Sequence, residues 1–373
     1  MAPRSVIALA TFVAGAIAQG IPLAQKHFDY NNLPYQADTD DGDRGRQFGY
    51  NICNSTTENQ ESKCQTSIIN SIDDWCVWSA PEPNSEIGYV EGESVAWCTK
   101  KGHGTRLIPQ GAITGVQFMK TPDYVQVVGH INQALINLKA DDGGGEMDPH
   151  GADQRGNPLG GLVFSNAWGG QYKQVIEWHN FMGSNIFCMK ACDPAGPNAA
   201  HYCEHVFDRI GCQYNAPAAY VDGVFESCEG ESQDFPGVYT DANGAVQTYT
   251  QPPESLGPIS TMPYTARIPK SSNCVAATSS VIFADLPAAT GAAAAPSSSA
   301  AASSGAPSAS GSATGGITKS VAASGTKATG SSTASATASG STNSASTVAF
   351  DIFGAAVAGV ITLGGAVLGV ALL

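Results

Sequence analysis

Two histidines and a glutamate stand in the order His-x-x-Glu-His, at His201, Glu204 and His205. On a helix, the imidazoles of such a motif share one face and can bind Zn²⁺, with the glutamate as general base, as in the inverted zinc peptidases. Two cysteines favour another interpretation, because Cys203 lies within the motif and Cys212 follows it. A disulfide would already account for an ordered segment here. We therefore expect a short disulfide-bonded helix without a metal ion or any other cofactor.

A second group of candidate ligands lies in the glycine-rich stretch 141–158. Carboxylates spaced among glycines can wrap Ca²⁺, which takes about six to eight oxygen ligands in a flexible cage. The acidic residues of this stretch, with its one histidine, are Asp141, Asp142, Glu146, Asp148, Asp153 and His150. Their spacing does not match an EF-hand loop, and acid-rich loops are common on acidic proteins. A solvated loop without regular structure is the favoured interpretation.

The third candidate is the pair Glu177 and Trp178, which His179 follows. A glutamate beside an aromatic ring in a strand could line a groove that binds sugars. With a second carboxylate placed opposite, it could also cleave a glycosidic bond. The sequence places no such second carboxylate, and an alternating strand with outward polar residues explains the same pattern. No catalytic residue is assigned.

The two ends of the chain carry processing signals. Residues 1–18 combine a basic start, a short apolar run and a small-residue cleavage site, which predicts a secretory signal peptide. Residues 348–373 form an apolar tail with no Lys or Arg behind it. This pattern predicts that the tail is exchanged for a GPI anchor at Asn343, with Gly340 or Ser341 as alternative attachment sites. A retained transmembrane helix is the alternative for the tail.

Composition then divides the rest of the chain in two. Residues 288–347 are almost entirely Ala, Ser, Thr and Gly. Such a segment buries too little apolar surface to offset its chain entropy, so we expect an unfolded stalk that is O-glycosylated. A plain flexible linker is the alternative. Residues 19–287 remain as one folded ectodomain, which is long enough to bury a sizeable core.

All ten cysteines fall in the expected ectodomain. An even number of cysteines behind a signal peptide predicts five disulfides, formed in an oxidising compartment. The cysteines are Cys53, Cys64, Cys76, Cys98, Cys188, Cys192, Cys203, Cys212, Cys228 and Cys274. They form an N-terminal group of four and a C-terminal group of six, and pairing within each group is the simplest arrangement. Asn54 begins an N-glycosylation sequon, expected on an exposed loop.

The elements that would position these residues are mostly strands. Segments such as "YVQVVGHI" alternate and are rich in β-branched residues, and turn signals such as Thr121-Pro122-Asp123 separate them. The pattern predicts a mainly β, disulfide-rich, antiparallel β-sandwich or jelly-roll-like ectodomain with one or two short helices. One of these helices is expected between Cys64 and Cys76, and "QALINLKA" is expected as a strand. Residues 19–48 are expected to form a mobile arm or surface loop.

The charge balance limits the classes of partner. The chain has 18 basic and 32 acidic residues, a formal net charge of −14. Such a surface repels nucleic acid and anionic lipid, so we expect neither as a partner. Contact with a membrane is expected only through the GPI anchor, in the outer leaflet of the plasma membrane.

Several long phrases carry a family resemblance over roughly residues 47–259. "QFGYNICNSTTENQESKCQT", "VAWCTKKGHGTRLIPQGAITGVQFMKTPDYVQVVG" and "VIEWHNFMGSNIFCMKACDP" resemble the fungal macrophage-activating glycoproteins, which are similar to the immunoreactive mannoproteins of basidiomycete yeasts. The resemblance implies a secreted, mannosylated surface or cell-wall glycoprotein that host immune cells recognise. It brings no catalytic residues to this sequence.

The leading prediction is a non-enzymatic, GPI-anchored glycoprotein on the extracellular face of the plasma membrane or in the cell wall. Its expected partners are host lectin receptors that bind its glycans, or cell-wall polysaccharide. Two alternatives stay open: a carbohydrate-binding module with aromatic residues near Glu177, and a hydrolase that remodels wall polysaccharide.

Overall fold

The computed structural model describes residues 20–289. The expected signal peptide (1–18), all but the first two residues of the expected stalk (288–347), Asn343 and the expected tail (348–373) lie outside the described residues. Within 20–289, no helix combines the length and the apolar character that crossing a bilayer requires.

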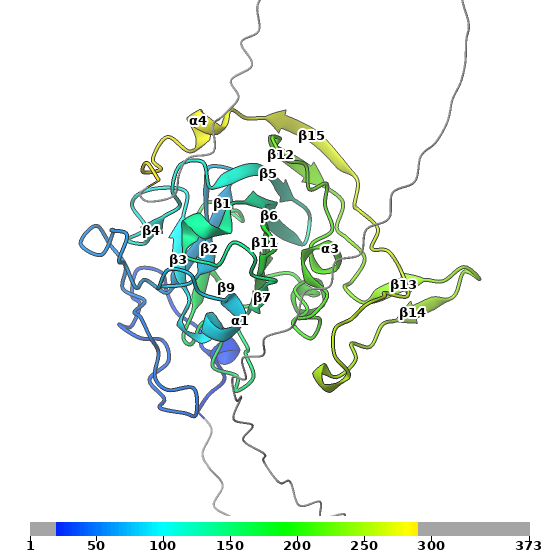
Figure 1. Ribbon diagram of the computed structural model, residues 1–373, viewed down its shortest axis with the longest axis horizontal. Helices are drawn as coiled ribbons and strands as arrows, with labels where there is room; N and C mark the ends of the chain where they lie inside the picture. The colour runs from blue at the N-terminus through cyan, green and yellow to red at the C-terminus, as the bar shows by residue number, and fades with distance from the viewer. Residues whose placement is uncertain (1–19, 290–373) are drawn as a thin grey trace, which may run out of the picture. The chain divides into compact units, whose positions relative to one another are not determined.

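Two β-sheets form the body of the described part of the chain, as the sequence predicts (Figure 1). The first sheet has six strands in the order β4 (Arg106–Leu107), β3 (Val95–Cys98), β2 (Asp74–Ser79), β1 (Thr66–Ser71), β8 (Leu162–Ser165) and β9 (Lys173–Val175). The second has seven, in the order β15 (Ser271–Ala276), β12 (Phe225–Gly230), β5 (Ile113–Lys120), β6 (Tyr124–Ile131), β11 (Ile186–Cys192), β10 (Trp178–Gly183) and β7 (Gly145–Met147). The mainly β fold class is therefore confirmed.

Short elements connect these strands. A separate hairpin, β13 (Val238–Thr240) with β14 (Val246–Thr248), projects from the two sheets in Figure 1. The helices of the described part are α1 (Ile87–Val90), α2 (Ala199–Tyr202), α3 (Gly211–Asn215) and α4 (Ser279–Ile282). The 3₁₀ turns are η1 (Leu23–Gln25), η2 (Glu91–Glu93), η3 (Gln133–Ile136) and η4 (Glu254–Leu256).

Most strand pairs are antiparallel, but three pairs are parallel. These are β1 with β8, β3 with β4, and β5 with β12. Parallel neighbours cannot be joined by a tight hairpin, so each pair requires a longer connection. The antiparallel strands β5 and β6 are joined by a tight hairpin, and the predicted turn lies between them.

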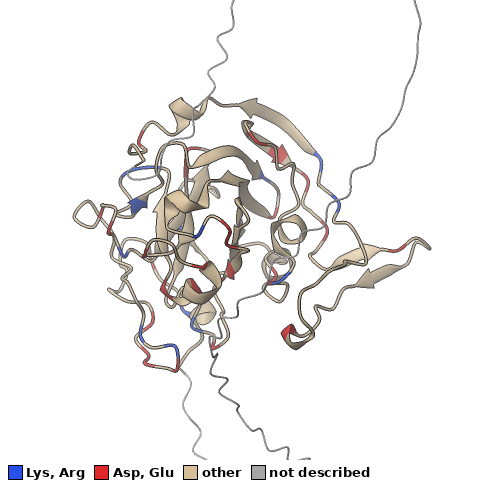
Figure 2. Ribbon diagram, viewed as in Figure 1, with Lys and Arg blue, Asp and Glu red and all other residues tan. Residues whose placement is uncertain are grey.

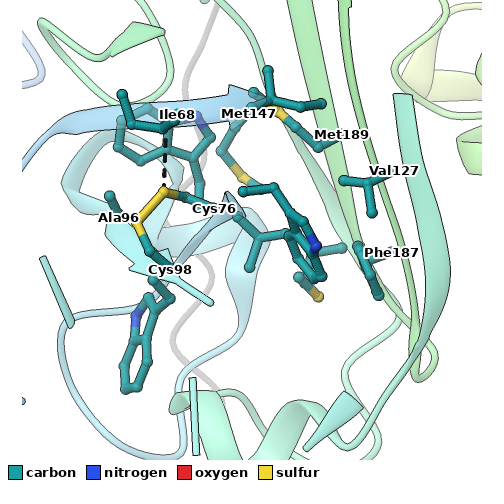
Figure 3. Close-up of a cluster of buried hydrophobic side chains, with 14 of the residues drawn as sticks. Ile68, Cys76, Ala96, Cys98, Val127, Met147, Phe187 and Met189 are labelled. Atoms are coloured by element: carbon teal, nitrogen blue, oxygen red, sulfur yellow. Dashed lines mark hydrogen bonds between the residues drawn. A yellow bond between two sulfur atoms is a disulfide. The ribbon is translucent and has the colours of Figure 1, made fainter. Parts of the chain in front are cut away.

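The core lies between the two sheets. The ring of Trp75 on β2 stacks on Phe187 of β11 with centroids 5.1 Å apart, and Trp78 lies against Trp178 of β10 at 5.8 Å. Figure 3 shows the Cys76–Cys98 disulfide within the same buried cluster. Burying aromatic rings of this size contributes about 1.5–3 kcal/mol each, which makes the interface between the sheets a principal source of stability.

Three local expectations are wrong, and packing explains each. The expected helix between Cys64 and Cys76 is the β1–β2 hairpin, because both strands pair with further strands of the sheet. The expected strand in "QALINLKA" is the turn η3. The expected mobile arm over 19–48 is packed in its described part, where the Leu23 side chain is only 2% exposed.

Five disulfides link the ten cysteines, all within the two predicted groups. The pairs are Cys53–Cys64, Cys76–Cys98, Cys188–Cys212, Cys192–Cys203 and Cys228–Cys274. Two of these pairs start on β11, and they hold α2, α3 and the segment between them against the second sheet. We call residues 193–215 the covering segment.

Candidate functional site

Residues from three of the sequence candidates meet at one place. His150 comes from the acidic stretch, Glu177 from the presumed sugar groove and His205 from the zinc-peptidase motif, and one ligand atom of each lies within 4.8 Å of the others. The imidazole rings of His150 and His205 stack with centroids 3.6 Å apart. His150 Nε2 lies 3.4 Å from Glu177 Oε2. We call these three residues the His–Glu centre.

Backbone hydrogen bonds and a disulfide hold the three segments that carry these side chains. His150 follows β7, and its N–H donates to Asp148 Oδ1 at 2.7 Å in a tight turn. Glu177 directly precedes β10, and its carbonyl accepts the N–H of Cys192 at 3.0 Å. His205 lies two residues after Cys203, whose disulfide ties the covering segment to β11. The fold therefore brings together side chains that lie up to 55 positions apart along the chain.

More carboxylates surround the centre. Glu146 on β7 and Asp148 directly after that strand are buried. Glu91 of η2 accepts the N–H of Glu146 through Oε1 at 3.1 Å. Figure 2 marks an acidic position on β7, and η2 carries Glu91 and Glu93. Glu204 and Asp208 of the covering segment add two more negative groups that act on Glu146.

Burial makes three of these carboxylates, those of Glu146, Asp148 and Glu91, hard to ionise. Desolvation, with the charge of Asp148 as the next cause, raises the pKa of Glu146 well above its usual value. Desolvation also raises the pKa of Asp148, and it raises the pKa of Glu91 to about 7. The pattern is that of negative groups held close together in a region with little water.

The pKa values of the two imidazoles of the centre are shifted in opposite directions by their surroundings. Burial opposes charge on His150, but the hydrogen bond and charge of Glu177, together with Asp148, raise its pKa overall. Burial, followed by the charge of His150, lowers the pKa of His205. A neutral imidazole such as His205 has a free nitrogen lone pair that can bind a metal ion.

Among residues 20–289, none of the six carboxylates near the centre forms an ion pair with Lys or Arg. These six are Glu91, Glu146, Asp148, Glu177, Glu204 and Asp208. Their ion pairs at short range are with histidine alone, Glu177 with His150 and Glu204 with His205. Within the described part of the chain, these six carboxylates therefore have no Lys or Arg nitrogen within ion-pair distance.

The zinc-peptidase motif itself does not form its usual geometry. α2 ends at Tyr202, so His201 and His205 do not share a helical face. The His201 side chain is exposed and its ring lies against Phe235, with centroids 5.2 Å apart. Of the motif, only His205 belongs to the His–Glu centre, and Glu204 lies next to it, with Oε1 3.9 Å from His205 Nδ1.

The acidic stretch is not the solvated loop without regular structure that the sequence favours, because it contains β7 and three of its carboxylates are buried. Asp142 is used structurally, because its Oδ2 accepts the N–H of Ile87 at 2.8 Å, and Asp141 is exposed. Asp153 pairs with Arg44. Glu146 and Asp148 are the two carboxylates of this stretch that lie near the centre, so the stretch does not gather around one point as a calcium loop would.

Two further candidates have clear surroundings. Trp178 is 1% exposed and packs against Trp78 in the core, so its ring is not available to stack on a sugar. Asn54 is exposed on a turn next to Cys53, where a glycan has space.

A cleft that sequence reasoning missed lies between the covering segment and the β13–β14 hairpin. It has a volume of about 950 Å³. Its aromatic lining residues are Tyr202, Tyr214, Phe235, Tyr239 and Tyr264. The rings of Tyr239 and Tyr264 stack in parallel at 4.4 Å, and Arg267 forms a bidentate ion pair with Asp234 at the same cleft. The tyrosines are spread over more than 60 positions, so no local motif could have indicated the cleft.

Comparison with known proteins identifies fungal relatives. The chain is 42% identical over 229 residues to appressorium protein ROW2 of Mycosarcoma maydis, across 60% of this chain and 77% of that protein. It is 46% identical over 217 residues to appressorium protein ROW1 of the same fungus, across 57% of this chain but only 50% of that longer protein. Neither relative is named as an enzyme. No protein-family model matches the chain, and no solved structure is detectably similar to it.

Proposed function

The chain belongs to the family of appressorium protein ROW2, and from this premise we propose that it is a non-enzymatic glycoprotein of the fungal cell surface. In this proposal a GPI anchor at Asn343 and a glycosylated stalk over 288–347 hold the ectodomain at the plasma membrane or in the cell wall. Mannose-rich glycans on the stalk and at Asn54 are then displayed to host lectin receptors, as in the mannoproteins that the sequence resembles.

The observation that carries the proposal is the complete use of the cysteines in disulfides. None of the ten is free, and all five bonds join parts of one ectodomain. Disulfides persist in oxidising compartments and are rare in the cytosol, so they support secretion. Crosslinks of this kind also restrict unfolding, which protects a displayed domain from extracellular proteases.

Treatment of intact cells with phosphatidylinositol-specific phospholipase C tests the anchor. The expected result is release of the protein into the medium. A matched triple variant, with Asn343, Gly340 and Ser341 each replaced by Gln, should be lost from the cell surface. Retention of the wild-type protein in the membrane fraction after active treatment would contradict the GPI anchor. Binding of the released protein to a mannose-specific lectin, and its loss after mannosidase treatment, tests the display of glycans.

A second candidate function is binding of cell-wall polysaccharide, and the tyrosine cleft favours it. Aromatic rings beside charged and polar groups suit the apolar faces and hydroxyls of a saccharide, and the volume of the cleft lies in the usual range for ligand sites. Deglycosylated protein should bind wall glucan, chitin or mannan, and Tyr239→Ala should weaken that binding. Tyr89→Ala is the matched control, because this tyrosine is 86% exposed and is not among the cleft residues. Equal binding by both variants would exclude the cleft.

A further inference from the structure

We propose that the His–Glu centre binds one divalent metal ion, Zn²⁺ or a first-row transition metal with similar ligand preferences. His150, Glu177 and His205 are its protein ligands. This site differs from the zinc-peptidase motif in the sequence, because it uses only one histidine of that motif. The inference does not depend on the proposed surface display or on the tyrosine cleft.

The spacing of the donor atoms fits such an ion. A tetrahedral Zn²⁺ ion with bonds of about 2.1 Å holds its ligand atoms about 3.4 Å apart. His150 Nε2 and Glu177 Oε2 are 3.4 Å apart, and all three ligand atoms lie within 4.8 Å of one another. The His205 side chain is 32% exposed, so a small rotation can bring its ring nitrogen to the ion and end the stacking on His150.

Unpartnered polar groups are the second, independent observation, one at the centre itself and one on β7, two residues before Asp148. The Glu146 side chain is only 4% exposed, and neither of its carboxylate oxygens has a hydrogen-bond partner. His205 Nδ1 is also buried and has no hydrogen-bond partner, since Glu204 Oε1 lies 3.9 Å away. A buried polar group without a partner costs free energy, and protein interiors usually satisfy such groups by hydrogen bonds, water or metal coordination.

The donor set determines the class of ion. Two imidazoles and one carboxylate, with positions left open for water, are typical of Zn²⁺ and of Fe²⁺, Mn²⁺ or Co²⁺ sites. Ca²⁺ prefers a cage made of oxygen ligands alone, so it should bind poorly here. A second cluster in the structure, Glu226 with Cys228 and Cys274, offers no competing site, because its two sulfurs are bonded to each other.

Calorimetric titration with ZnCl₂ tests the proposal. The full secreted protein is purified without a histidine tag and stripped with a chelator. Wild-type protein should bind one Zn²⁺ per chain, and a large excess of CaCl₂ should not displace it. His150→Ala and His205→Ala should each lower the affinity by more than the roughly 10–100-fold effect that is typical of residues outside the coordination sphere.

Two controls separate a built site from general binding or misfolding. His201→Ala removes an exposed histidine of the same covering segment and should leave the affinity unchanged. Glu177→Gln keeps the side-chain shape and should weaken Zn²⁺ binding while the melting temperature of the metal-free protein stays close to that of the wild type. The proposal is overturned if Zn²⁺ does not bind stoichiometrically, if the His150 and His205 variants bind as the wild type does, or if His201→Ala lowers the affinity equally.

Discussion

At the scale of single residues, Asp74 shows how a partly buried carboxylate contributes stability that depends on pH. Its Oδ1 contacts His103 Nε2 at 2.6 Å, and its Oδ2 accepts a hydrogen bond from Asn70 at 2.9 Å. Burial opposes ionisation, but His103, Asn70 and the charge of Lys100 outweigh it and lower the pKa of Asp74 below its usual value. The folded state therefore favours the ionised form more than the unfolded state does.

Asp74→Asn should lower the free energy of unfolding by about 1.5–3 kcal/mol at pH 7, the usual contribution of a hydrogen bond to a charged group. The wild-type contribution is fully present above the unfolded pKa of about 4 and is lost as pH falls through the lower folded pKa, so the two proteins should converge in strong acid. Urea unfolding at pH 7 and at pH 3 measures the difference. Asp41→Asn is the control, because Asp41 pairs with Arg46 in an exposed ion pair that should contribute little. A difference that grows in acid would contradict this account.

The residues of the His–Glu centre also show how far sequence reasoning extends. His150, Glu177 and His205 each belong to a segment that the sequence indicates as a candidate site, so each residue could be named before the structure was known. Their meeting could not be predicted, because it depends on β7, β10 and a disulfide on β11 being neighbours in space. Burial of Trp178 was equally hidden, since an alternating strand pattern does not reveal which of its faces meets the other sheet.

At the scale of elements, strands separated by clear turns were predictable and tertiary context decided the rest. β5 and β6 have alternating, β-branched sequences with a turn between them, and both form as predicted. The segment between Cys64 and Cys76 has apolar spacing that suits a helix, yet β1 pairs with β8 and β2 pairs with β3 across long sequence distances. Those pairings bury the side chains of Ile68 and Trp75 almost completely. The free energy gained by this burial outweighs the weak helical preference of the local sequence.

The disulfide between Cys192 and Cys203 should order the covering segment as well as stabilise the fold. Replacing both cysteines by alanine should lower the free energy of unfolding by about 3 kcal/mol, as chain entropy predicts for a short loop. The matched control replaces Cys53 and Cys64, which enclose the same sequence separation of 11. Both double variants should lose similar global stability, but only the first should speed amide hydrogen exchange around His205. Faster exchange there in both variants would show that the bond has no local role.

At the scale of the whole molecule, the last described residues pack back against the first sheet. Phe283 and Leu286 are about 5% exposed, and the Phe283 ring meets Trp75 of β2 edge-on with centroids 6.3 Å apart. The carbonyl of Pro287 accepts the N–H of Gln110 at 2.7 Å. These contacts bring the end of the expected ectodomain back onto the first sheet, so the boundary predicted at 287 can be tested by truncation.

Two truncations, ending after residue 289 and after residue 277, should therefore behave differently. The longer one keeps every contact just described and should melt within a few degrees of the full chain. The shorter one removes α4, Phe283 and Leu286, and losing two buried apolar side chains costs at least about 3 kcal/mol. For a domain of this size that loss lowers the melting temperature by roughly 6–12 °C. Calorimetry of the three secreted proteins measures the effect, with Phe283→Ala as a full-length control that should fall between the two truncations. If the longer truncation melts as early as the shorter one, residues beyond 289 contribute to the fold and the predicted boundary is wrong.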